Sequence, residues 1–105
     1  MAQKDRRLIL SSKFRELLGN NNVYFQPPQS KVMKYPCVRY ERVKIPVTRA
    51  DNGIYLKRYT YSATLIYTDP DSDMPENMLD LFEYISHDRQ YVADNLIHDV
   101  YTIVI

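Results

Sequence analysis

Apolar residues recur at helical spacing near the start of the chain. Leu10, Phe14, Leu17 and Leu18 fall at positions i, i+4, i+7 and i+8, so they share one face of a helix. Gly19 follows and precedes three asparagines, and glycine suits the left-handed conformation that commonly ends a helix. The pattern predicts a short first helix that ends at Gly19.

The middle of the chain alternates between two kinds of position, as strands do. From Tyr55 to Thr68, every second residue from Tyr59 to Tyr67 is apolar or aromatic and the residues between are mostly polar. A second strand is predicted from Cys37 to about Lys44, directly after Pro36. A short extended piece at 23–25 is ended by two prolines, which cannot donate to a ladder.

The two long strands are predicted to form an antiparallel hairpin. Asp51, Asn52 and Gly53 lie between them, and these residue types tolerate positive φ in a reversal. Tyr55 and Tyr59 lie among the charges of this hairpin. Its solvent face and tip are predicted to be basic, with Arg42, Lys44, Arg49, Lys57 and Arg58.

A polar turn separates the hairpin from a predicted second helix. The turn runs from Asp69 through Asp71 to Asp73, and Asp73 with Glu76 has the spacing of a capping box. Pro75 falls in the first helical turn, where its missing N–H is harmless. The expected apolar stripe of this helix, which extends to Ser86, consists of Met78, Leu79, Phe82 and Ile85.

Strands are predicted for the rest of the chain, at 90–93 and 97–105. The order of helix, strands, helix and strands predicts an α+β fold in one domain, residues 1–105, with two helices packed on one face of a largely antiparallel, mixed sheet. The run from Val100 to Ile105 has little polar alternation, so both of its faces need cover. We expect the helices to cover one face, and the other face to be covered by something else, such as a neighbouring subunit.

Charge is divided unevenly along the chain, although the net charge is only +1. Residues 1–30 carry +3, residues 31–58 carry +6, and residues 59–105 carry −8. The basic and acidic halves could attract each other within one fold, or could form opposite faces that meet between copies.

The residues argue against an enzyme and against a cofactor or metal site. The aspartates from Asp69 resemble the start of a calcium loop, but Met74 stands where the loop needs glycine and Asp80 where it needs glutamate. Two glycines cannot build a phosphate-binding loop. Cys37, the one cysteine, has no local motif with His87 or His98, so we expect a core thiol and two surface imidazoles.

No apolar run approaches the roughly 20 residues that cross a bilayer, and the start lacks a secretory signal. We therefore expect a protein made and kept in the cytosol, without membrane contact. The basic hairpin with its tyrosines could grip nucleic acid. The near-neutral net charge and the acidic second half favour a protein contact instead.

Four segments resemble a family of small proteins from the tails of long-tailed phages. They are NVYFQPP at 22–28, KVMKYPCVRYE at 31–41, RADNGIYLKRYTYSATLIYTDPDSD at 49–73 and DRQYVADNLIHDVYTIVI at 88–105. The chain is similar, over most of its length, to the tail terminator or tail completion proteins. Their described fold, a mixed sheet flanked by helices, agrees with the prediction above.

The resemblance implies a structural virion protein of the tail and neck, made in the cytoplasm of a host bacterium. Such a protein forms a hexameric ring that caps the tail tube, stops tube polymerisation and offers the surface to which the filled head joins. Its partners are other copies of itself, the tube protein and a head-tail connector or neck protein. Family members need no cofactor and are not enzymes, and no direct nucleic-acid binding is expected.

Two alternatives remain open at this point. One is another neck component, such as a head completion or stopper protein, and the other is a small nucleic-acid-binding regulatory protein that uses the basic hairpin. For a ring, we expect the basic hairpin of one subunit to meet the acidic region of its neighbour. Asp69 and Asp71 are the acidic residues proposed for that contact.

Overall fold

The computed structural model describes residues 3–29, 31–44, 47–49, 55–57 and 59–105. Its elements follow the order α1 (Gln3–Leu18), β1 (Val23–Phe25), β2 (Cys37–Lys44), β3 (Val47–Arg49), β4 (Tyr55–Lys57), β5 (Thr60–Tyr67), α2 (Met74–Met78), β6 (Ile85–Ala93) and β7 (Leu96–Val104). Five strands form one sheet in the order β1-β2-β5-β7-β6, while β3 and β4 form a separate pair. The predicted α+β class is confirmed.

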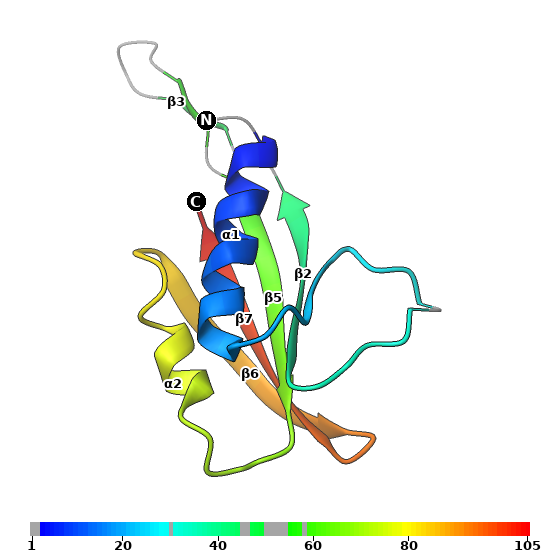
Figure 1. The fold of residues 1–105 in the computed structure, drawn as a ribbon. Helices are drawn as coiled ribbons and strands as arrows, with labels where there is room; N and C mark the ends of the chain where they lie inside the picture. The colour runs from blue at the N-terminus through cyan, green and yellow to red at the C-terminus, as the bar shows by residue number, and fades with distance from the viewer. Residues whose placement is uncertain (1–2, 30, 45–46, 50–54, 58) are drawn as a thin grey trace.

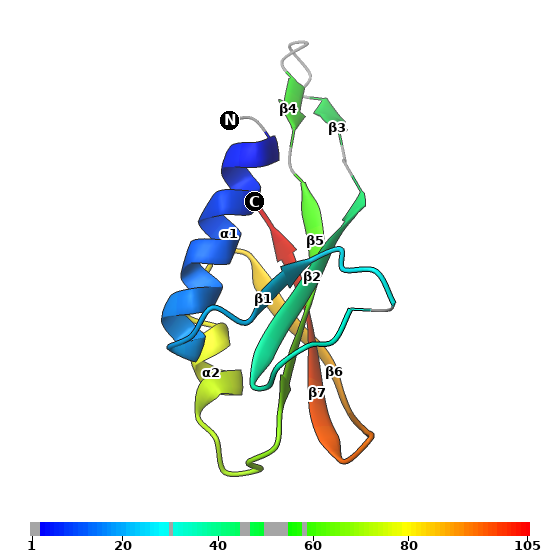
Figure 2. The same cartoon turned by 45° about the vertical axis from the view of Figure 1, so that its right-hand side comes forward.

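The sheet is mixed, and both helices lie on the same face of it (Figures 1 and 2). Among the strands of the described residues in this sheet, only β1 and β2 are parallel, and the pairs β2–β5, β5–β7 and β6–β7 are antiparallel. The C-terminal strand β7 therefore lies between two other strands. Ile105 then exchanges two backbone hydrogen bonds of 3.0 Å with Tyr59, which continues this pairing to the last residue.

The core lies between the helices and the sheet, and it is rich in aromatic rings. Phe14 of α1 meets Tyr40 of β2 edge to face, with ring centroids 5.3 Å apart, and Phe82 at 5.8 Å. The Tyr40 hydroxyl donates to the Arg7 carbonyl oxygen at 3.0 Å, which fixes the helix on the sheet. Period-2 alternation brings one face of each strand into the core, with Val38, Tyr40, Tyr61, Ala63, Leu65, Tyr101 and Ile103 buried beside Leu10, Phe14 and Met78.

The first helix ends as predicted. Gly19 adopts φ +70 and its N–H donates to the Arg15 carbonyl oxygen at 2.9 Å. A side chain at this φ would be strained, so glycine is the residue that closes the helix here. The helix itself begins seven residues before Leu10, at Gln3.

The second helix is much shorter than predicted, and this prediction was wrong beyond Met78. Residues 79–81 form backbone hydrogen bonds to the residue three positions earlier, with Leu79 donating to Glu76, Asp80 to Asn77 and Leu81 to Met78. Ile85 already pairs with Ile103 of β7. Phe82 and Ile85 still pack against the core. Because strand pairing takes over at Ile85, β6 begins five residues before the predicted Gln90.

The predicted capping box is also absent. Asp73 occupies the N-cap position of α2 but makes no side-chain bond to the helix. Ser72 takes that role in part, since its Oγ accepts the Met74 N–H at 3.2 Å. Pro75 lies in the first turn, as predicted.

Candidate interaction surfaces

The β3–β4 hairpin stands beyond the end of the five-stranded sheet (Figure 2). The predicted antiparallel pairing of the two long strands is confirmed by β2 and β5. The strand predicted over 55–68 is divided, however, because β4 leaves the main sheet and pairs with β3, with Val47 opposite Lys57 and Arg49 opposite Tyr55. Its reversal at 51–53 and Arg58 fall outside the described residues. The segment 44–58 carries four basic residues and one acidic residue. The molecule is elongated and measures 51 × 26 × 23 Å.

Arg42, which was assigned to the basic solvent face, lies on the helix-bearing side instead. Arg42 pairs with Tyr61 and is half-buried, because it lies two positions after the buried Tyr40 and so points to the same side. Tyr59 packs against the core at the base of the hairpin, with the Arg6 guanidinium 4.3 Å from its ring centroid. The assignment of Arg42 to the solvent face was wrong, whereas Tyr59 lies on the apolar side of the strand that the alternation predicted.

An acidic end lies opposite the hairpin, where the 68–73 loop leads from β5 to α2 (Figure 1). Asp69, Asp71 and Asp73 are all exposed. The predicted turn is present: the Ser72 N–H donates to the Asp69 carbonyl oxygen at 3.1 Å, and the Asp71 N–H donates to Asp69 Oδ1 at 2.9 Å. Glu76, Asp80 and Glu83 extend this exposed acidic surface along the chain.

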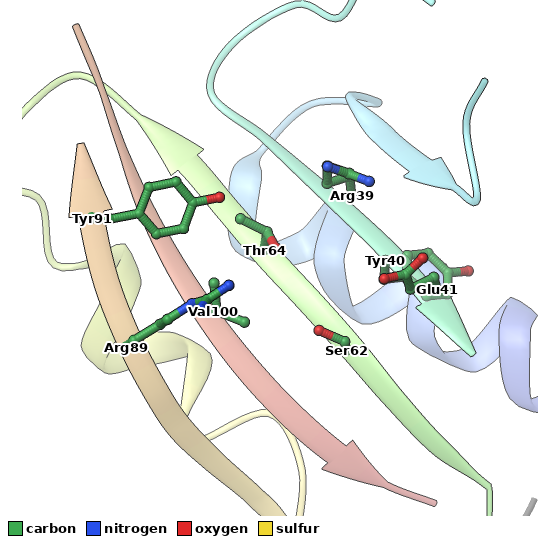
Figure 3. Close-up of a pocket in the computed structure, with 8 residues that line it drawn as sticks. All are labelled: Arg39, Tyr40, Glu41, Ser62, Thr64, Arg89, Tyr91 and Val100. Carbon is green, nitrogen blue, oxygen red and sulfur yellow. The ribbon is translucent and has the colours of Figure 1, made fainter. Parts of the chain in front are cut away.

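The face of the sheet that bears no helix is polar, and Figure 3 views it directly. A hollow of about 160 Å³ is lined by Arg39 and Glu41 of β2, Ser62 and Thr64 of β5, Arg89 and Tyr91 of β6, and Val100 of β7. We call this hollow the open-face trough. Val100 is buried there and Thr102 and Val104 are half-buried. The expectation that this face of the C-terminal strand needs cover is thus met in part by the chain's own side chains.

A buried polar cluster on the helix-bearing side was missed by the sequence analysis. Asp99 is 1% exposed, and its carboxylate accepts from the Tyr67 hydroxyl at 2.6 Å and from Gln90 Nε2 at 3.1 Å. His87 Nε2 lies 2.8 Å from Asp99 Oδ1, the same oxygen that accepts from Gln90, and the imidazole meets Tyr101 edge to face at 5.1 Å. Burial first, and then the Asp99 carboxylate, raises the pKa of Tyr67 to about 12. The Tyr101 pKa is raised chiefly by burial.

The missed signal was a single acidic residue inside the apolar run LIHDVYTIV. Asp99 lies two residues before Tyr101 and four before Ile103, so strand periodicity points it into the core with them. A carboxylate in such a position needs hydrogen-bond donors. The expectation of two surface imidazoles is therefore incomplete, because His87 serves Asp99, and His98 stacks on Tyr91 at 4.6 Å.

A paired histidine and aspartate can serve as a general base when a nucleophile lies within reach. The groups around His87 in the described structure are Asp99 and the Tyr101 ring, with no serine or cysteine bonded to it. Cys37 is a core thiol, as predicted, and burial raises its pKa to about 11 against a smaller opposite effect of Arg39. The contacts of Asp99 in this cluster join Tyr67 of β5, His87 and Gln90 of β6, and β7 itself.

The described residues contain no group of three histidine, cysteine or acidic side chains that could hold a metal ion. Among the helices of the described chain, none is long and apolar enough to cross a bilayer. No protein-family model and no curated protein sequence matches this chain.

Proposed function

We propose that this chain is a structural virion protein that forms a ring, hexameric in the family it resembles, at the end of a phage tail tube. The ring ends tube polymerisation and provides the surface for head-tail joining. The resemblance of four sequence segments supports this function. The mixed sheet with helices on one face agrees with the fold expected for that family.

The observation that carries the proposal is the β3–β4 hairpin. It pairs only within itself among the described strands and stands off the domain (Figure 2). A two-stranded hairpin on its own is marginally stable in water. An arm of this kind gains stability when it packs on another protein, and in a ring that protein is the next subunit or the tube.

The charge distribution suits a ring. A cyclic assembly joins one patch of each subunit to a different patch of the next. Here a basic segment, with Lys44, Arg49 and Lys57, lies at the end of the molecule opposite the exposed acidic loop. Opposite charges on opposite ends favour head-to-tail association and disfavour contacts between identical ends.

In this function the protein works by contact alone and has no catalytic step. Its partners are other copies of itself, the tube protein and a neck protein, and its place is the tail or neck of the virion. The strands that bear the core supply a rigid body, and the hairpin and the acidic end supply the contacts.

The proposal is tested by light scattering of the purified protein, alone and with tail tubes. We expect a mass gain on tube ends that corresponds to six copies, with no binding in a parallel DNA titration. A monomer that ignores tubes would contradict the proposal and favour a stopper-type neck protein. Salt-sensitive DNA binding by a monomer would favour the nucleic-acid-binding alternative.

A further inference from the structure

The open-face trough is built around one row of residues that crosses four strands. Arg39 pairs with Thr64, Thr64 with Val100, and Val100 with Arg89. Three strand-to-strand steps of ~4.8 Å separate the outer backbones by about 14 Å. Two long arginine side chains therefore rise at the ends of the row, with two smaller side chains between them as the floor (Figure 3).

The size of the trough selects small polar groups. Its volume of about 160 Å³ is below the roughly 300 Å³ at which pockets for cofactors and drug-sized ligands begin. A side-chain carboxylate with a few waters fits, since each water occupies about 30 Å³. The hydroxyls of Ser62 and Thr64 add donors beside the two guanidinium groups.

The trough is electropositive and its charges are available. Arg39 and Arg89 are exposed, and within the described ranges neither forms an ion pair. Glu41 is the one acidic residue that lines the trough. A guanidinium offers a planar fork of donors that matches a carboxylate in a bidentate pair.

The aromatic residues of this face are not arranged for stacked bases. Tyr91 already stacks on His98, with an interplanar angle of 14°, and the Arg89 guanidinium lies 5.5 Å from its ring centroid. Lys31 lies 5.8 Å from the centroid of Tyr24 in the same way. Single-stranded nucleic acid is held by stacking on open ring faces, so these contacts favour an acidic peptide segment as the occupant.

The chain itself contains such a segment in the 68–73 loop. Asp69, Asp71 and Asp73 lie exposed on one turn, and none is in an ion pair with another described residue. The loop leads into α2, which lies on the helix-bearing face, so it turns away from the trough of its own chain (Figures 1 and 2). The trough of a second copy is the complementary surface.

We propose that the open-face trough, with Arg39 and Arg89 at its two sides, binds the acidic 68–73 loop of a neighbouring copy. This inference rests on the proposed function, because it names one contact of the ring. It places the acidic loop on the trough and not on the basic β3–β4 hairpin, which is then left for the tube or another part of a neighbouring copy. The contact joins two different patches, as a closed ring requires.

A peptide titration tests the contact without a ring. A labelled peptide of residues 68–80 is titrated against the full chain at low salt by fluorescence anisotropy. We expect saturable binding that weakens at least tenfold in an Arg39→Glu/Arg89→Glu variant and with a peptide carrying Asp69→Asn, Asp71→Asn and Asp73→Asn. The matched control is Lys13→Glu/Arg15→Glu on α1, which makes the same charge change on the helix-bearing side and should bind as the unmodified chain does.

Three results would overturn the inference. They are equal peptide binding by the trough variant and the unmodified chain, equal binding of the acidic and amide peptides, and selective binding of a single-stranded DNA oligonucleotide at the trough with no peptide binding. Circular dichroism and thermal unfolding of each variant show that the fold is retained.

Assembly on tail tubes separates this inference from the proposed function. Arg39→Glu/Arg89→Glu should lose ring formation, and adding Asp69→Lys, Asp71→Lys and Asp73→Lys to the same chain should restore it. Rings that tolerate the trough variant would refute the trough contact and leave the proposed function intact. If the unmodified chain forms no ring, the proposed function fails, while the peptide titration still decides whether the trough binds the loop.

Discussion

Two buried tyrosines on β5 provide a matched test of the polar cluster. Tyr67 and Tyr61 point to the same side of the strand and are 4% and 0% exposed. The Tyr67 hydroxyl donates to the buried Asp99 carboxylate at 2.6 Å, whereas the Tyr61 hydroxyl has no partner among the described residues. Replacing each tyrosine with phenylalanine removes a hydroxyl oxygen that is hydrogen-bonded at Tyr67 and, within the described part of the chain, unbonded at Tyr61.

The expected magnitudes follow from the hydrogen bonds. A bond to a charged group contributes about 1.5–3 kcal/mol, so Tyr67→Phe should lower the free energy of unfolding by that amount. For a domain of this size, each kcal/mol corresponds to about 4–8 °C in Tm. Tyr61→Phe removes a buried hydroxyl that lacks a partner, so its free energy of unfolding should stay the same or rise.

The assay is urea unfolding followed by circular dichroism, with Tm as a second readout. Tyr67→Phe should also lose its effect in an Asp99→Ala background, because the acceptor is then already gone. Equal free energies of unfolding for Tyr67→Phe and Tyr61→Phe would refute the reasoning. So would a Tyr67→Phe effect that is undiminished without Asp99.

Deleting Val100–Ile105 should leave insoluble or unfolded protein. Burial of the three buried side chains of this segment contributes about 5–9 kcal/mol to the free energy of folding, against a typical total stability of about 5–15 kcal/mol. A soluble, folded truncation would contradict the core assignment. Arg49→Glu with Lys57→Glu should weaken assembly on tubes and reduce its salt sensitivity, and an unchanged ring would exclude a role of these charges. The buried Cys37 thiol, with its pKa raised to about 11, should react slowly with a thiol reagent at neutral pH and faster as the pH rises. The stability that the folded state gains from the protonated thiol should be present below pH ~9 and be lost as the pH rises through ~11. Rapid labelling at pH 7 would show that the site opens.

The strand β5 was predictable from the sequence because its core-facing positions are apolar or aromatic and the positions between them are mostly polar. Tyr61, Ala63, Leu65 and Tyr67 alternate with residues of the open face, and all four are buried in the structure. Gly19 ends α1 for the reason that the sequence suggested. These local signals agree with the final packing, and such agreement makes an element recognisable.

The second helix was not predictable from the same kind of pattern. Met78, Leu79, Phe82 and Ile85 have helical spacing, but Phe82 and Ile85 reach the core from a chain that has already left the helix. A short apolar run fits a helix and a strand equally well. Pairing of Ile85 with Ile103 decides between them, and that partner lies 18 residues away.

The candidate surfaces depended even more on contacts between distant residues. Arg42 was assigned to the solvent face from its charge, although its strand parity with the buried Tyr40 places it on the core side. Arg39 and Arg89 are 50 positions apart, and only the register through Thr64 and Val100 puts them in one row. Neither residue stands out in the sequence.

The central claim is that copies of this chain form a ring at the end of a tail tube. The most direct test is electron microscopy of tail tubes polymerised with and without the purified protein. We expect a six-fold ring at one end of each tube and an arrest of tube growth at that end. Tubes that keep growing, with no added density at either end, would contradict it.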